Sequence, residues 1–284
     1  MLCHCHWQPD RARARTIIVV HGLEGSSESQ YARGIAYKGL AAGMNVIRYN
    51  QRNCGGTDGL APVLYHSGLS SDIGAVMREL IARDGVSRFA LVGFSMGGNL
   101  VLKLAGELGS GLPELRAVAA CCPALDLAFS ADALHEPANR LYEIYFLWAL
   151  RRRMLQKARL FPQDFDPNRL NGIRSLREFD DKITAYYCGF AGAVDYYDRA
   201  SAAHVVGRIA VPTLVLHALN DPFIRITPAT REKFLANPNI TLVETEDGGH
   251  CAFIGRRNGR AGESGLDDDG YWAENEIVKF LRRI

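Results

Sequence analysis

The sequence predicts an α/β protein with a mostly parallel sheet flanked by helices, and two observations point to this class. Short apolar segments that are typical of strands alternate with segments of helical periodicity. Several of the apolar segments are also uninterrupted, which is typical of parallel strands buried on both faces. The predicted strands are 16–20, 45–49, 89–92, 117–122, 213–216 and 241–243.

Helices are expected between these strands, because start and stop signals flank the periodic segments. A helix over 31–42 is ended by Gly43, and a second over 72–82 has Ser71 or Asp72 as its N-cap. Two further helices are predicted over 96–108 and 273–283. The stretch Gly255–Gly270 is rich in Gly, Arg and Asp and is expected to form a surface loop.

The alternation stops between 124 and 206, where the chain becomes helical and aromatic and contains no credible strand. We therefore predict one domain over 1–284, with a core formed by 1–123 and 207–284. The segment 124–206 is predicted to be a helical cap, inserted between two strands of the sheet and covering the edge where the strands end.

The composition excludes some function classes. Lys and Arg number 33 against 31 acidic residues, so the net charge is +2 and offers no field for binding nucleic acid. Seven irregularly spaced cysteines lie mostly in apolar segments, which indicates reduced thiols rather than a disulfide framework. No N-terminal apolar stretch is long enough for a signal peptide. We expect a cytoplasmic protein.

The N-terminal Cys3-His4-Cys5-His6 resembles a metal-binding motif. Strict alternation instead indicates a strand, whose adjacent side chains point to opposite faces and cannot all reach one ion. We predict that this strand forms a hairpin with 16–20, and we expect no metal or organic cofactor.

The segment Gly93-Phe94-Ser95-Met96-Gly97 lies between a predicted buried strand and a predicted helix. A sharp turn there projects the Ser95 hydroxyl above the sheet, beside the first free N–H groups of the helix. This geometry suits a nucleophile whose attack creates an oxyanion. The alternative is a glycine-rich turn without chemistry.

A serine nucleophile needs a base and a carboxylate that orients the base. His250 follows the strand 241–243, and Asp221 follows the strand 213–216, so both are expected at the same sheet edge as Ser95. Asp126 and Asp247 are alternative acids. We favour Asp221.

The loop after the strand 16–20 can place the backbone N–H of Leu23 opposite that of Met96, giving an oxyanion two donors. His21 is expected to brace this loop. The predicted substrate-pocket residues are His66, Phe146 and Trp148.

The aromatic segment 142–150 is followed by Arg151-Arg152-Arg153. We expect it to form an apolar wall over Ser95. An alternative is weak contact between this part of the cap and a membrane surface.

Six segments carry a family resemblance: His21–Ser26, Tyr65–Gly68, Gly93–Asn99, Glu178–Thr184, Asp221–Phe223 and Gly248–Gly255. They are similar to those of the YheT-like α/β-hydrolases, which group bacterial predicted hydrolases with eukaryotic relatives acting on medium-chain esters or phospholipids. The resemblance implies an α/β-hydrolase fold with Ser95, Asp221 and His250 as catalytic triad. The family usually carries at least one more strand ahead of 2–7.

Together these observations predict a serine esterase that cleaves short- to medium-chain carboxylic or lipid esters through an acyl-enzyme on Ser95. Acyl transfer to an alcohol, or thioester hydrolysis, could use the same residues. A non-catalytic lipid-binding module is the alternative from another class.

Overall fold

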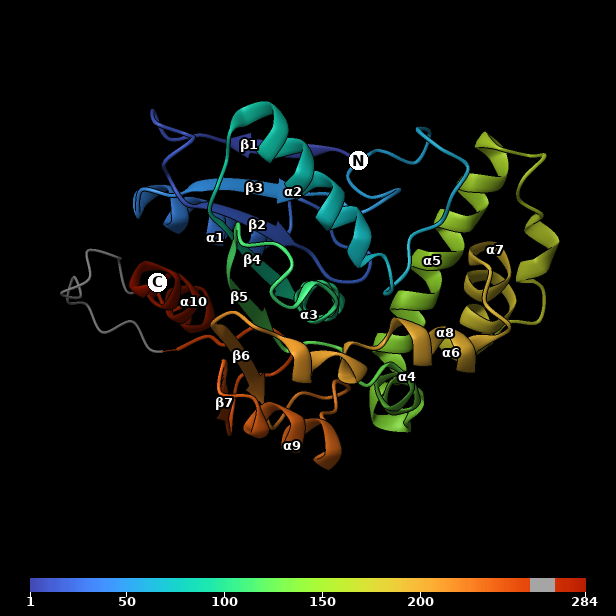
Figure 1. The fold of residues 1–284 in the computed structure, drawn as a ribbon. Coiled ribbons are helices and arrows are strands. Elements are labelled where there is room, and N and C mark those ends of the chain that lie inside the picture. The colour runs from blue at the N-terminus through green and yellow to red at the C-terminus, as the bar shows by residue number, and fades with distance from the viewer. Residues whose placement is uncertain (256–268) are drawn as a thin grey trace.

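The computed structural model describes residues 1–255 and 269–284, and these residues contain a seven-stranded sheet in the order β1-β3-β2-β4-β5-β6-β7 (Figure 1). β1 is antiparallel to β3, and every other neighbouring pair is parallel. The predicted fold class is therefore confirmed. The strands are β1 Cys3–His6, β2 Thr16–Val20, β3 Asn45–Tyr49, β4 Phe89–Phe94, β5 Leu115–Cys121, β6 Thr213–Ala218 and β7 Ile240–Thr245.

The four predicted helices are present, with ends within two residues of those expected. Most of the predicted surface loop, 256–268, lies outside the described residues. The α-helices are α1 Gln30–Ala41, α2 Ser70–Asp84, α3 Met96–Leu108, α4 Leu127–His135, α5 Arg140–Leu160, α6 Leu176–Phe179, α7 Tyr186–Cys188, α8 Ala193–Ala200, α9 Pro228–Ala236 and α10 Trp272–Arg283. A π-helical turn, Asp180–Ala185, connects α6 to α7.

Both faces of the sheet are covered by helices. Ile17 and Val19 of β2 belong to a core cluster that includes side chains of α1 and α10. Ile18 and Val20 belong to a second cluster with side chains of α2 and α3. Adjacent strand residues point to opposite faces, so all must be apolar in a strand that is covered on both sides.

The N-terminal strand is present, but its predicted partner is wrong. β1 pairs with β3, with Cys3 opposite Tyr49 and His6 opposite Val46. β2 already has β3 on one side and β4 on the other, so it has no free edge. β3, the neighbour of β2, has a free far edge, and β1 pairs there.

The chain between β5 and β6 is helical and contains α4 to α8. Figure 1 shows these helices gathered to one side of the sheet, away from α10 and the C-terminus. They share a hydrophobic cluster of their own, which includes Met154 and Ile183 and extends to Phe223 and Ile224 after β6. We refer to residues 124–206 as the cap segment; its role in covering substrate stays a prediction.

His21, directly after β2, anchors the loop that follows. The ring is fully buried; Nδ1 lies 2.8 Å from the Gly22 carbonyl, and Nε2 accepts the backbone N–H of Gln51 at 3.2 Å. These partners assign the neutral ring, with its proton on Nδ1. Burial lowers the pKa of His21 from 6.5 to about 4.

We expect acid to destabilise the fold through this histidine. The unfolded chain takes up the proton near pH 6.5, whereas the folded chain takes it up only near pH 4. Stability is therefore lost as the pH falls through this window, by up to about 3 kcal/mol from His21. Urea unfolding of wild type and His21→Gln between pH 7.5 and pH 4 measures the effect. An equally steep fall in His21→Gln, whose amide does not titrate there, would contradict it.

Candidate active site

Ser95 lies in the turn between β4 and α3, with φ 55° and ψ −120°. Its N–H donates to the Cys121 carbonyl of β5 at 2.9 Å, which fixes the turn against the next strand. A Cβ on Gly93 would collide with the Gly97 carbonyl, and one on Gly97 would collide with the Val20 carbonyl. Only glycine fits at these two positions, so the spacing in the sequence reflects a steric requirement of the turn.

Ser95, His250 and Asp221 form one hydrogen-bonded chain. Ser95 Oγ lies 3.0 Å from Nε2 of His250, and Nδ1 of His250 lies 2.8 Å from Oδ2 of Asp221. A carboxylate only accepts, so Nδ1 carries the proton and Nε2 is free to accept the serine proton. The other carboxylate oxygen of Asp221 accepts the backbone N–H groups of Phe223 and Ile224. The carboxylate is thereby oriented toward the imidazole.

The two alternative acids have other partners. Asp126 accepts the backbone N–H of Thr227 at 3.1 Å and the Thr230 hydroxyl at 3.0 Å. It therefore positions the start of α9. Asp247 accepts from the side chain of Asn220 at 3.0 Å.

The loop after β2 lies against the serine. A Cβ on Gly22 would lie 3.1 Å from Cβ of Ser95. Within residues 1–255 and 269–284, the backbone N–H groups of Leu23 and Met96 donate to no acceptor. Both residues line the pocket that contains Ser95. Two free donors beside a candidate nucleophile are the arrangement that a developing oxyanion requires.

An ion pair that the sequence analysis missed joins this loop to the cap segment. Arg153 of α5 donates to both carboxylate oxygens of Glu24, at 2.8 and 3.0 Å, and to Asp58 at 3.0 Å. Glu24 has φ 56°, its N–H donates to the Tyr65 hydroxyl, and that hydroxyl donates back to Glu24 Oε1. Burial opposes the charge of Arg153, but the bonds to Glu24 raise its pKa overall. In the sequence, the position of Glu24 next to Leu23, a predicted oxyanion donor, was the signal that could have directed attention to Glu24.

An apolar pocket opens beside Ser95, between the core and the cap segment. The predicted residues His66 and Phe146 line it, but Trp148 does not. Trp148 is 57% exposed and its ring contacts the Arg152 guanidinium, so its prediction was wrong. A step of two residues turns a helix by about 200°, which points Trp148 away from the face of Phe146. The apolar lining comprises Leu23, Met96, Ala124, Leu127, Ala131, Leu134, Phe146, Leu150, Leu176, Phe223 and Ile224.

A buried carboxyl lies in the wall of this pocket. Asp180 accepts hydrogen bonds from the hydroxyls of Thr184 and Tyr197, at 2.7 and 2.8 Å. Burial raises its pKa to about 6, although these bonds act in the opposite direction. His66 accepts the Gly68 N–H on Nδ1, and burial lowers its pKa to about 4, so its ring is neutral. Near neutral pH the ring of His66 in the pocket wall is therefore uncharged, whereas the carboxyl group of Asp180 is mostly ionised.

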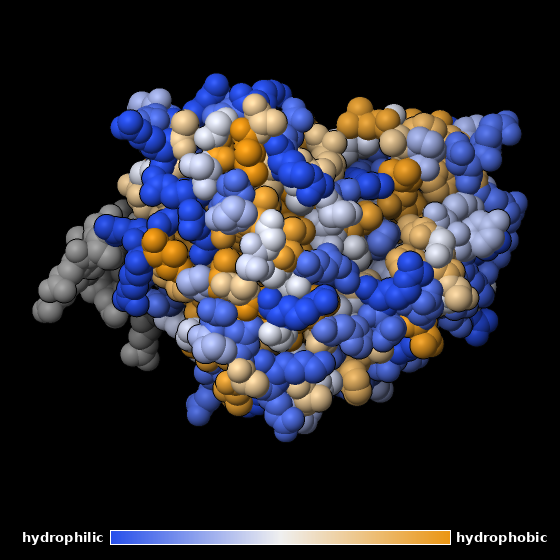
Figure 2. All heavy atoms as spheres, viewed as in Figure 1, coloured by the Kyte–Doolittle hydropathy of each residue, from blue (hydrophilic) through white to orange (hydrophobic). Residues whose placement is uncertain are grey.

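The three consecutive arginines do not form one surface patch. Arg153 points inward to Glu24, Arg151 donates to the Leu170 carbonyl, and Arg152 lies over Trp148. α5 does expose apolar side chains, and Figure 2 shows hydrophobic surface over this part of the molecule. Among the described residues, no helix combines the length and apolarity needed to cross a membrane. Contact with a membrane surface stays a prediction.

Comparison with known proteins agrees with the observed fold. The family model described as alpha/beta hydrolase fold matches residues 15–256. The Escherichia coli protein named "Putative esterase YheT" is 35% identical over 254 residues, which cover 88% of this chain and 74% of that protein. The resemblance to the YheT-like family is thus confirmed.

Two eukaryotic relatives are longer than this chain. Phospholipase ABHD3 of Mus musculus is 30% identical over 86% of this chain and 60% of its own length. A monoacylglycerol lipase of Saccharomyces cerevisiae is 27% identical over 94% of this chain and 58% of its own length. The chain therefore spans about three fifths of these two relatives.

Solved structures support the fold. Est1E from Butyrivibrio proteoclasticus, with ferulic acid bound, has a TM-score of 0.60 and 15% identity, covering 99% of this chain and 94% of that chain. The monoacylglycerol lipase of Paleococcus ferrophilus has a TM-score of 0.57 and 19% identity, covering 99% and 98%. Sheet order, the turn at Ser95 and the family match lead to one conclusion: this chain belongs to the α/β-hydrolase family.

Proposed function

We propose that this protein is a serine hydrolase of carboxylic esters. The observation that carries the proposal is the hydrogen-bonded chain from Ser95 through His250 to Asp221, which ends beside an apolar pocket. The names of the relatives, which include an esterase, a phospholipase and a monoacylglycerol lipase, support ester bonds as the target.

The reaction begins when Nε2 of His250 takes the Ser95 proton and Oγ attacks the ester carbonyl. Asp221 stabilises the imidazolium and keeps Nε2 directed at the serine. The N–H groups of Leu23 and Met96 bind the oxyanion of the tetrahedral intermediate. His250 then gives its proton to the leaving alcohol. Water repeats the sequence on the acyl-enzyme and releases the acid.

The pocket favours an apolar acyl chain. Its lining near Ser95 is dominated by aliphatic and aromatic side chains from the cap segment and from the loop after Asp221. Burying each methylene of a substrate in such a wall stabilises the complex by about 0.8 kcal/mol. We therefore assign short- to medium-chain acyl esters or lipid esters as the substrate class.

Ser95→Ala should abolish ester hydrolysis and labelling by a fluorophosphonate, because the attacking oxygen is removed. Removal of a triad member lowers turnover by roughly 10⁴- to 10⁶-fold. Hydrolysis of p-nitrophenyl esters, with circular dichroism to confirm folding, provides the measurement. Residual activity above a few per cent in the folded variant would exclude Ser95 as the nucleophile.

Asp221→Asn should lower turnover by about 10⁴-fold, because an amide presents the wrong partner to the Nδ1 proton. Asp126→Asn is the matched control: it contacts Thr227 and Thr230 rather than His250, and should alter stability more than turnover. The two values of kcat, measured on one ester, decide between the acids. A larger loss in Asp126→Asn would reverse the assignment.

Phe146→Ala should shift acyl preference toward longer chains, because it opens space in the pocket wall. A change of one methylene is worth about 1 kcal/mol or more in such a wall, or roughly fivefold or more in kcat/KM. Trp148→Ala, two residues along the same helix but exposed, is the control and should keep the wild-type profile. Profiles of kcat/KM against acyl length that coincide for all three proteins would remove Phe146 from the acyl site.

A further inference from the structure

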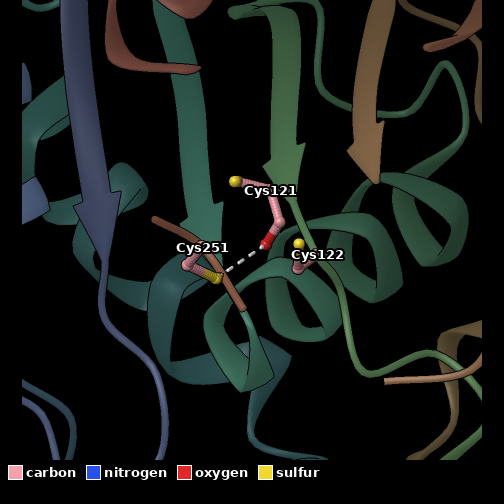
Figure 3. Close-up of side chains that lie close together, drawn as sticks. All are labelled: Cys121, Cys122 and Cys251. Carbon is pink, nitrogen blue, oxygen red and sulfur yellow. Dashed lines mark hydrogen bonds between the residues drawn. The ribbon is translucent and has the colours of Figure 1, made fainter. Parts of the chain in front are cut away.

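Three cysteines lie together beside the candidate active site (Figure 3): Cys121, Cys122 and Cys251, here called the thiol cluster. Their sulfur atoms lie within 4.8 Å of one another. Cys121 and Cys122 are fully buried, whereas Cys251 is partly exposed. All three are free thiols, and the ester hydrolysis proposed above uses none of them.

The backbone explains why three sulfurs converge. Adjacent residues of a strand point to opposite faces, so Cys121 and Cys122 could not share a ligand within a regular strand. β5 ends at Cys121, however, and Cys122 has φ 42°, a left-handed conformation that turns its side chain out of the strand pattern. Cys251 also has positive φ, 62°, and its thiol points to the Cys121 carbonyl at 3.7 Å.

The thiol cluster lies next to His250 and Asp221. Sγ of Cys251 lies 4.0 Å from Nε2 of His250. Ligand atoms of Cys122, Asp221 and His250 also lie within 4.8 Å of one another. His250 is not grouped with all three sulfurs within that distance, so its Nε2, which borders the cluster at Cys251, must shift to reach an ion that the three sulfurs hold.

We propose that the thiol cluster is a binding site for one thiophilic divalent cation, such as Zn²⁺ or Cd²⁺, with Nε2 of His250 as the fourth ligand. Three thiolates and one imidazole are a donor set that Zn²⁺ binds tetrahedrally. With Zn–S bonds of about 2.3 Å, a tetrahedron holds its sulfurs about 3.8 Å apart. Shifts of about 1 Å or less bring the sulfurs to that spacing.

Occupancy of the site inhibits the enzyme. The ion takes the lone pair of Nε2 that otherwise accepts the Ser95 proton, and the three thiols release their protons to solvent as they bind. No oxidant or reductant is involved. The inhibitory half of this inference rests on the proposed function, whereas the binding half does not.

Titration of the metal-free, reduced protein with Cd²⁺ tests both halves. The experiment uses a Cys3→Ala, Cys5→Ala background, so that the N-terminal cysteines do not contribute. One equivalent should produce the ultraviolet charge-transfer band of cadmium thiolates and, in parallel, abolish ester turnover; a chelator should reverse both. Cys251→Ala should weaken binding by at least about 10- to 100-fold, the loss caused even by an outer-shell partner.

Cys188→Ala is the matched control, since Cys188 is also partly buried but lies in the cap segment. It should keep the band and the inhibition. Cys122→Ala is the second test variant, and each variant is compared with its own metal-free rate after circular dichroism has confirmed folding. If the band forms with Cd²⁺ but the metal-free protein has no esterase activity, the result supports the site and excludes the proposed function. Absence of the charge-transfer band would overturn the proposed site. Inhibition that persists unchanged in the folded Cys251→Ala and Cys122→Ala variants would also overturn it, as would inhibition that only a thiol reductant reverses.

Discussion

The backbone conformation of Ser95 is the constraint on which the candidate active site depends. A non-glycine residue at φ 55° and ψ −120° costs on the order of 1–3 kcal/mol, so the surrounding structure must hold it. The Ser95 N–H bonds to β5, and its carbonyl accepts the N–H groups of Asn99 and Ala124. The turn is therefore tied at once to the sheet, to α3 and to the start of the cap segment. Each attachment directs the hydroxyl toward His250.

A buried ion pair connects the loop after β2 with the cap segment, and both of these line the pocket. Arg153 and Glu24 are 129 residues apart in the chain, yet their side chains are both largely buried and bonded at two points. A buried charge that loses its partner costs about 3–5 kcal/mol, so separating the cap segment from the loop after β2 would be strongly unfavourable. The residue next to Glu24 is Leu23, whose N–H is a proposed oxyanion donor. The position of the cap and the geometry of the site are thus linked through one ion pair.

Side chains of different chemical types follow the parallel strands and lie together at the carboxyl edge of the sheet. Ser95 follows β4, Asp221 follows β6, and His250 follows β7. β5 lies between β4 and β6 and ends at Cys121, so Cys121 and the following Cys122 lie near Asp221 and His250. The fold that brings Ser95, Asp221 and His250 together therefore also brings three thiols close to the same histidine. Occupancy of the proposed thiol site would then be connected to the proposed esterase activity.

The sequence by itself determined the elements whose signals are local. Uninterrupted apolar strands, helix ends and the glycine spacing around Ser95 depend on neighbours a few residues away, so pattern alone predicted them. The positions of Ser95, Asp221 and His250, each after a predicted strand, were also readable, because parallel strands end at one edge of a sheet. Tertiary structure alone decided the rest. β1 pairs with β3 because the edges of β2 are occupied, α5 turns its Phe146 face toward the pocket because the cap segment packs there, and Arg153 meets Glu24 through packing. These outcomes depend on contacts between distant segments, which no local periodicity encodes.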